Sequence, residues 1–163
     1  MVVSFIACQP KAETNNKQEE LTTEKDNTNV ESNLSKSDST LNTLNDKIRA
    51  DVNNKDLYLE RADFYLENQN AKEAMQDINR AFRIDTMYLP TILKQADFLT
   101  KSGKLELSLN VLDRANKIYP ENSDIQVAYS QLYLVARNNT KSISYDDLAI
   151  KYNMYNAEAY YLK

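Results

Sequence analysis

The sequence predicts an all-α fold made of repeated antiparallel helix pairs, and three observations lead to this prediction. Only one glycine, Gly103, is present among the 163 residues, which disfavours a turn-rich β fold. From residue 55 on, small residues recur at a spacing of 34 residues, a period typical of helical arrays. Between them, apolar residues follow one another at spacings of three and four, as on one face of a helix.

The composition excludes several classes of function. The formal net charge is -4, and Lys and Arg are interleaved with Asp and Glu, whereas nucleic-acid binding needs a basic stripe. The absence of His and the presence of a single Cys exclude His-ligated metals, internal disulfides and Cys-cluster metal sites. One glycine is too few for a glycine-rich nucleotide loop. We therefore expect no metal, no cofactor and no catalytic residues.

The first eight residues differ from the rest of the chain, because they are uncharged and mainly apolar. Within them, Phe5-Ile6-Ala7-Cys8 resembles the lipobox of bacterial lipoproteins. This resemblance implies that residues 1–8 are the remnant of a lipoprotein signal peptide and that Cys8 is lipidated. No Lys or Arg precedes the apolar residues, as one normally would in a signal peptide. We therefore expect the natural chain to start upstream of Met1.

Residues 9–40 are polar and predict a disordered linker. They contain four apolar residues, fourteen Ser, Thr and Asn, and seven Asp and Glu against four Lys. Such a segment cannot bury enough apolar surface to offset the entropy lost on folding. As a flexible coil it would span roughly 30 Å, which suits a tether between a lipidated Cys8 and a folded domain at 41–163.

The repeat frame begins at Lys55 and gives three full repeats, 55–88, 89–122 and 123–156, without insertion or deletion. Three positions of this frame hold only Ala or Ser: Ala62, Ala96 and Ser130 at the eighth; Ala74, Ser108 and Ser142 at the twentieth; Ala81, Ala115 and Ala149 at the twenty-seventh. Small residues are needed where two helices approach closely. Each repeat is therefore expected to be a helix A followed by a helix B.

Residues 55–156 resemble the tetratricopeptide repeat (TPR) family, because these small residues, Gly103 at the A–B turn and Pro120 at the repeat end match its pattern. The resemblance implies a right-handed α-solenoid. A helix over about 41–51 is expected to cap the first repeat, and 157–163 to begin a fourth. Since solenoids need a polar capping element, we expect the natural chain to continue beyond Lys163.

Three local features lead to finer expectations. Ser123 followed by Gln126 predicts a capping box. Asp146 stands where the family has a large apolar residue, and we expect the second helix of the third repeat to begin late, near Ser144. Five tyrosines occupy packing positions of the family and are predicted to be core: Tyr65, Tyr129, Tyr133, Tyr152 and Tyr160.

The TPR resemblance also implies a partner-binding groove lined by one side of each helix A. At the corresponding positions this chain has Asp56, Leu59, Asp63, Leu66 and Glu67; Pro90, Leu93, Asp97, Thr100 and Lys101; and Asp124, Val127, Gln131, Leu134 and Val135. The mixture of apolar and acidic residues suits an extended or helical segment with apolar anchors and some positive charge. The family's clamp for a chaperone C-terminus needs Lys and Asn where this chain has Leu59 and Asp63, so that specialisation is rejected.

Together these patterns predict a non-catalytic, cell-envelope lipoprotein whose repeats act as a scaffold for protein–protein interaction. The chain would contact the membrane through the lipid on Cys8. The lipoprotein resemblance favours the outer membrane, because Cys8 is followed by Gln9 and not by the Asp that signals inner-membrane retention in some bacteria. A cytosolic adaptor with the same groove and no anchor is one alternative. A fragment of a glycan-binding outer-membrane lipoprotein is another.

Overall fold

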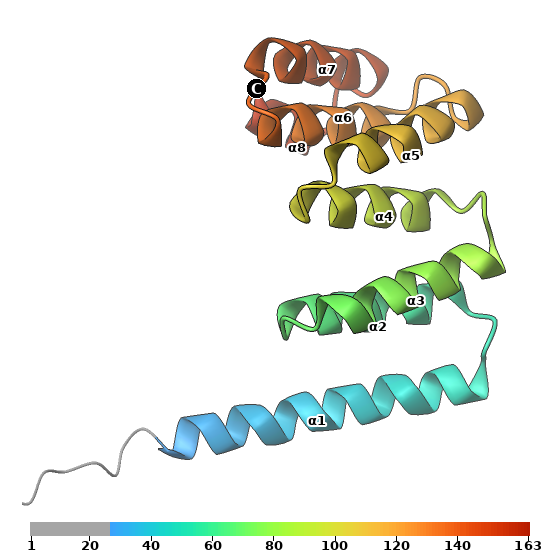
Figure 1. Ribbon diagram of the computed structural model, residues 1–163, viewed down its shortest axis with the longest axis vertical. Coiled ribbons are helices and arrows are strands. Elements are labelled where there is room, and N and C mark those ends of the chain that lie inside the picture. Colours follow the sequence, from blue (N-terminus) through green and yellow to red (C-terminus); the bar gives the residue numbers. More distant parts are fainter. Residues whose placement is uncertain (1–26) are drawn as a thin grey trace, which may run out of the picture. The chain divides into compact units, whose positions relative to one another are not determined.

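The computed structural model describes the backbone of residues 27–163 and the side chains of 39–163, and the fold below is that of the unit Ser37–Lys163. The described chain is all-helical (Figure 1). Its helices are α1 (Asn27–Ala50), α2 (Lys55–Glu67), α3 (Ala71–Ile84), α4 (Leu89–Lys101), α5 (Leu105–Ile118), α6 (Ser123–Val135), α7 (Asn139–Tyr152) and α8 (Ala157–Leu162).

The helices from α2 on form successive pairs in which the two members pack against each other: α2 with α3, α4 with α5, and α6 with α7. Helix A of each repeat (α2, α4, α6) begins 34 residues after the previous one, and α8 begins at the same interval. Each helix A also contacts the next helix A along the chain. The predicted α-solenoid fold is confirmed.

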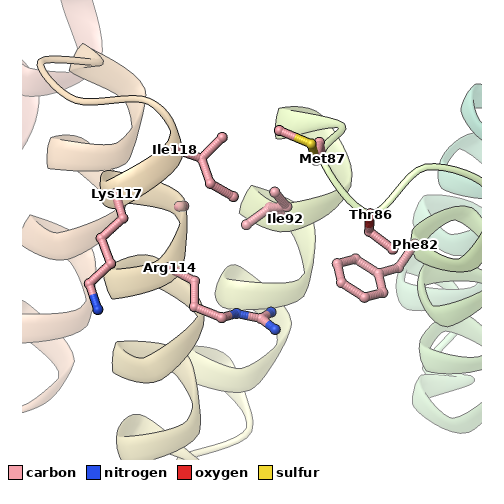
Figure 2. A pocket seen from close by; sticks show the side chains of 8 residues that line it. Phe82, Thr86, Met87, Ile92, Arg114, Lys117 and Ile118 are labelled. Atoms are coloured by element: carbon pink, nitrogen blue, oxygen red, sulfur yellow. The ribbon is translucent and has the colours of Figure 1, made fainter.

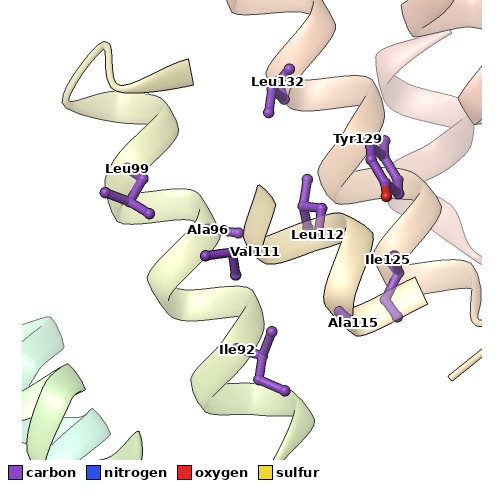
Figure 3. Close-up of a cluster of buried hydrophobic side chains, with 9 residues drawn as sticks. All are labelled: Ile92, Ala96, Leu99, Val111, Leu112, Ala115, Ile125, Tyr129 and Leu132. Atoms are coloured by element: carbon purple, nitrogen blue, oxygen red, sulfur yellow. The ribbon is translucent and has the colours of Figure 1, made fainter. Parts of the chain in front are cut away.

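The nine Ala and Ser residues that define the repeat frame are all in the interior, none more than 2% exposed. Larger side chains fill the space around them. The largest apolar cluster joins α4, α5 and α6 and is drawn in Figure 3: Ile92, Ala96, Leu99, Val111, Leu112, Ala115, Ile125, Tyr129 and Leu132. Because this cluster takes residues from both sides of a repeat boundary, it joins the second repeat to the third.

The helix ends repeat as regularly as the helix starts. Gln69, Gly103 and Arg137, which are 34 residues apart, all have positive φ, at 60°, 71° and 57°. In each turn the amide of the following residue donates back to a carbonyl in the last turn of helix A, for example from Lys104 to Leu99 at 2.9 Å. This is the left-handed helix ending that favours glycine, and two of the three turns adopt it without one.

Asparagine caps several helix starts. The side chains of Asn54, Asn122 and Asn156 accept hydrogen bonds from the first backbone amides of α2, α6 and α8. The predicted capping box at Ser123 is therefore wrong, because Asn122 already occupies the capping position. The Ser123 hydroxyl instead donates to the carbonyl of Ala149 at 2.9 Å and ties α6 to α7.

Two predicted boundaries differ from the structure. α7 begins at Asn139 and not near Ser144, since Asn138 accepts a hydrogen bond from the Lys141 amide and starts the helix there. α1 begins at Asn27, so residues 27–40, which we assigned to the linker, are helical. Val30 and Leu34 continue the helical spacing of the apolar residues that follow them. The linker predicted for residues 9–26 lies outside the described residues.

One pair of equivalent positions, between helix A and helix B, is filled differently in each repeat. In the first repeat Arg61 donates two hydrogen bonds of 2.7 Å to the carboxylate of Asp77 and a third, of 2.6 Å, to Asn45 of α1. In the second repeat the same positions hold Gln95 and Val111, and in the third they hold Tyr129 and Tyr145. The two tyrosine rings stack with their centroids 4.7 Å apart.

Asp146 is the most unusual residue of the core. It is fully buried, and among the residues that the structure describes neither oxygen of its carboxylate has a hydrogen-bond partner. The equivalent residues in the first two repeats are Ile78 and Leu112, which are also fully buried. Burial raises the pKa of Asp146, and the nearby charge of Asp147 adds to this rise. The Ser130 hydroxyl, which is bonded to Ser142, and the ammonium of Lys163 oppose it.

Candidate partner-binding groove

A cavity of about 280 Å³ lies along the helix A side of the solenoid, between α4, α6 and α8. We call it the helix A groove. It is lined by Leu93, Lys94, Asp97, Asp124, Val127, Ala128, Gln131 and Glu158. Because α4 contacts α6 and α6 contacts α8, the cavity follows the line along which successive A helices pack. Its walls are therefore positioned by the 34-residue repeat itself.

The helix A groove is acidic around an apolar floor. Its three carboxylates come from Asp97, Asp124 and Glu158. Asp97 is paired with the exposed ammonium of Lys101 at 2.8 Å. Asp124 and Glu158 accept hydrogen bonds only from neutral amides, at 3.2 Å from Asn156 and at 2.6 Å from Gln131. Within the described part of the chain, no cation pairs with either of these two carboxylates at the cavity wall.

The single cation of the groove, Lys94, already has a partner. Its ammonium lies 2.5 Å from the carboxylate of Asp63 on α2. This ion pair links α2 to α4 and turns the charge of Lys94 toward the first repeat. The cavity thus offers a positively charged ligand two carboxylates that are hydrogen-bonded only to neutral amides among the described residues, and little repulsion.

The structure brings five of the predicted groove residues together around this cavity: Leu93, Asp97, Asp124, Val127 and Gln131. Val127 is buried at 4% exposure beside Ala149 and Ala159, so it forms the floor. Leu93 packs against the large core cluster from the other side. The helix A groove is therefore formed by α4 of the second repeat and α6 of the third, and Glu158 of α8 completes its lining.

Other predicted groove residues lie elsewhere. Leu59 is only 7% exposed and packs with Ile48 of α1, and Thr100 is 5% exposed and hydrogen-bonded to Ser108 at 2.7 Å. Both side chains belong to the core, and their part in partner binding stays a prediction. Leu134 is 45% exposed but does not line the cavity.

In the first repeat, the predicted acidic residues are occupied by contacts within the chain. Asp56 accepts a hydrogen bond of 2.6 Å from the Tyr88 hydroxyl, and Asp63 holds Lys94. Leu66 is half-buried against the small cluster of Ala62, Ala74 and Ile78. These residues extend the helix A face beyond the cavity and remain predicted contacts for a longer partner.

Lys94, Ala128 and Glu158 also line the helix A groove, although the sequence patterns did not predict them there. A signal was present for Glu158, because it falls in the fourth repeat at the position that Asp56 and Asp124 hold in the first and third. Lys94 and Ala128 share another position of the frame, one residue after Leu93 and Val127. That position lines the groove here because α4, α6 and α8 leave it uncovered.

The tyrosines divide between core and surface. Tyr129 is 4% exposed, and Tyr133 stacks on Tyr145 with ring centroids 5.4 Å apart. Tyr65 and Tyr152 are half-buried. The core assignment of Tyr160 is wrong, because that side chain is 57% exposed on α8.

Residues 39–163 contain no group of three or more acidic, Cys or His side chains close enough to share a metal ion. Among the helices that the structure describes, none combines the length and the apolar character needed to cross a bilayer. Cys8 lies outside the described residues, and its lipidation stays a prediction.

Comparisons with known proteins identify the fold. No family model matches the sequence, and no curated protein matches it either. Among solved structures, the chain is similar to that of MamA, with a TM-score of 0.60 and 15% identity over 80% of this chain and 76% of that one. It is also similar to YrrB, described as a TPR protein with an unusual peptide-binding site, with a TM-score of 0.62 and 18% identity over 82% and 69% of the two chains.

Proposed function

We propose that this TPR-like solenoid is a non-catalytic scaffold that binds a basic, amphipathic segment of a partner protein in the helix A groove. The single observation on which the proposal depends is that two carboxylates at the wall of this cavity, Asp124 and Glu158, pair with no cation among the described residues. A segment with a Leu-like side chain would fill the floor between Leu93 and Val127. A Lys or Arg of the same segment would pair with the two carboxylates.

The charge distribution along the solenoid supports this choice of partner. Helices α2, α4, α6 and α8, which form the helix A side, hold seven Asp and Glu against four Lys and Arg. Three of those four cations are in ion pairs with carboxylates of the same side or of the next loop: Lys55 with Asp85, Lys94 with Asp63, and Lys101 with Asp97. The side that would receive a partner therefore has a negative potential, which favours encounter with a basic segment.

A pair of synthetic peptides tests the proposal. Both have about 15 residues with Leu at helical spacings of three and four; one has Lys at the remaining positions and the other has Glu. We expect the Leu/Lys peptide to bind the full chain, as measured by fluorescence anisotropy. Reversing both carboxylates (Asp124→Lys with Glu158→Lys) should weaken its Kd about tenfold or more, since two attractive pairs become repulsive.

The matched control is Glu106→Lys, which changes the net charge in the same direction but at an exposed residue of α5 outside the groove. Its Kd for the Leu/Lys peptide should stay within about twofold of the wild type, because Glu106 does not line the cavity and salt screens its exposed charge. Equal binding of the peptide to the wild type and to the reversed variant would contradict the proposal.

We also propose that the scaffold is anchored in the cell envelope, at the outer membrane, through a lipid on Cys8. The lipobox-like Phe5-Ile6-Ala7-Cys8 and the polar residues that follow it support this proposal. In the cells that naturally make the protein, we expect a membrane-bound species that begins at an acylated Cys8, and a Cys8→Ala variant that is released from the membrane fraction. Intact mass of each fraction is the measurement. A soluble species that retains Met1 would favour a cytosolic adaptor instead.

A further inference from the structure

A second groove lies on the opposite side of α4 from the helix A groove. Three adjoining cavities of about 370, 390 and 380 Å³ lie between α3, α4 and α5. Neighbouring cavities share a residue, Arg114 in one case and Met75 in the other, so they form one continuous α3–α5 groove. The backbones of α3 and α5 each lie close to that of α4 but not close to each other. α4 is therefore the floor of this groove, and α3 and α5 are its walls.

The geometry of α4 separates the two grooves. Successive residues of an α-helix are rotated by about 100°, so residues two apart point in nearly opposite directions. Leu93 and Asp97 line the helix A groove, whereas Gln95 and Leu99, two residues further on in each case, line the α3–α5 groove. A ligand in one groove therefore leaves the other free.

The charge of the α3–α5 groove is opposite to that of the helix A groove. Its lining residues include no Asp or Glu, but they include the cations Lys72, Lys104, Arg114 and Lys117. None of these four is paired with a carboxylate within the described part of the chain. Figure 2 shows Arg114 extending from α5 toward Phe82, whose ring centroid lies 5.8 Å from the guanidinium carbon.

Several apolar side chains in the groove are exposed. Met87 is 56% exposed, Leu107 is 54% exposed and Ile118 is 40% exposed. Phe98 and Val111 lie deeper among the lining residues. Met75 and Met87, with their flexible thioether side chains, allow such a surface to adapt to the shape of a ligand.

We propose that the α3–α5 groove is a second docking surface, which binds an acidic amphipathic segment of a partner protein. Charge complementarity is the argument for this occupant: four cations without acidic partners surround an apolar floor, in a chain of net charge -4. Carboxylates of the segment pair with Lys104 and Arg114, and its apolar side chains pack on Leu107 and Phe98. The scaffold thereby holds a basic segment and an acidic segment on opposite sides of the same helix.

The Leu/Glu and Leu/Lys peptides defined above test this inference when added to the ¹⁵N-labelled full chain. We expect the Leu/Glu peptide to shift the backbone amide signals of α3 and α5, and the Leu/Lys peptide to shift those of α6 and α8. Lys104→Glu with Arg114→Glu should weaken the Kd of the Leu/Glu peptide about tenfold or more. Leu107→Ser, which leaves the charge unchanged, should weaken it several-fold through lost apolar contact.

The matched control reverses two exposed cations outside the groove, Arg83→Glu with Lys151→Glu, and should leave the Kd of the Leu/Glu peptide within about twofold. A circular dichroism melt of each variant verifies that it is folded. The inference is overturned if the Leu/Glu peptide fails to bind, or if it shifts α6 and α8 instead. Tighter binding of a single-stranded DNA oligonucleotide or of phosphatidylglycerol vesicles than of the Leu/Glu peptide also overturns it. Because the two peptides report on different helices, failure here leaves the proposal for the helix A groove standing.

Discussion

Replacing Arg61 with Met is expected to lower the free energy of unfolding by about 3–5 kcal/mol, because it leaves the buried carboxylate of Asp77 without its cation. The Asp77 side chain is only 7% exposed, and both of its oxygens accept hydrogen bonds from the guanidinium. The same substitution removes the hydrogen bond to Asn45, which ties α1 to α2. Urea unfolding at neutral pH, followed by circular dichroism, measures the loss.

Two further variants distinguish the stability effect of the buried ion pair from that of an exposed one. Arg49→Met breaks an exposed ion pair with Asp46, whose side chains are 77% and 72% exposed, and it should cost less than about 1 kcal/mol. Arg61→Gln combined with Asp77→Val installs the pair found in the second repeat, and it should restore most of the stability because no charge is left buried. A single Arg61→Met variant as stable as the Arg49→Met variant would show that solvent reaches Asp77.

The opposite result, a gain in stability, is expected when Asp146 is replaced with Leu, the residue at the same position of the second repeat. The buried carboxylate without a hydrogen-bond partner destabilises the folded state, and its removal should raise the free energy of unfolding at pH 7 by about 1–3 kcal/mol. Asp146→Asn tests the charge alone in a side chain of similar size. Asp147→Asn is the control, because the adjacent Asp147 is exposed and paired with Lys163, and it should change stability by less than about 1 kcal/mol.

The gain should depend on pH in a defined direction. Burial raises the pKa of Asp146 in the folded state above its ordinary value of 3.8, so the folded chain binds this proton more tightly than the unfolded chain does. Below pH 3.8 the carboxyl is protonated in both states and carries no penalty. As the pH rises from 3.8 through the raised pKa, the penalty develops and then stays constant. The stability difference between Asp146→Asn and the wild type should therefore be largest at pH 7 and shrink toward pH 4; a difference independent of pH would contradict this account.

The repeat frame could be predicted from the sequence because it depends on the sizes of side chains at a fixed spacing. Ala62, Ala96 and Ser130 have no room to be anything larger, and they are at most 1% exposed. Such packing constraints are local and identical in each repeat. The start of α1 could not be predicted in the same way, because residues 27–40 are polar and composition alone favours disorder.

The exposure of the predicted groove residues was harder to predict, since exposure depends on contacts outside the repeat pattern. Leu59 is buried in a cluster with Ile48 of α1, whereas the equivalent Leu93 of the second repeat is only partly buried. Thr100 turns inward because Ser108 offers it a hydroxyl partner, whereas the equivalent Leu134 remains exposed. A family pattern predicts which side of helix A faces outward. Which residues on that side are exposed depends on the helices and side chains that pack against it.

The different pairs at the A–B contact of each repeat have a consequence for how the chain finds its native register. Repeat proteins can misfold by exchanging equivalent helices, within one chain or between two. Here, α2 placed against α5 would bury Arg61 beside Val111, and α6 placed against α3 would bury Asp77 beside Tyr129. Each mismatch leaves a charge without its partner in the core. The different residue pairs at this position therefore favour the packing of each helix A against its own helix B.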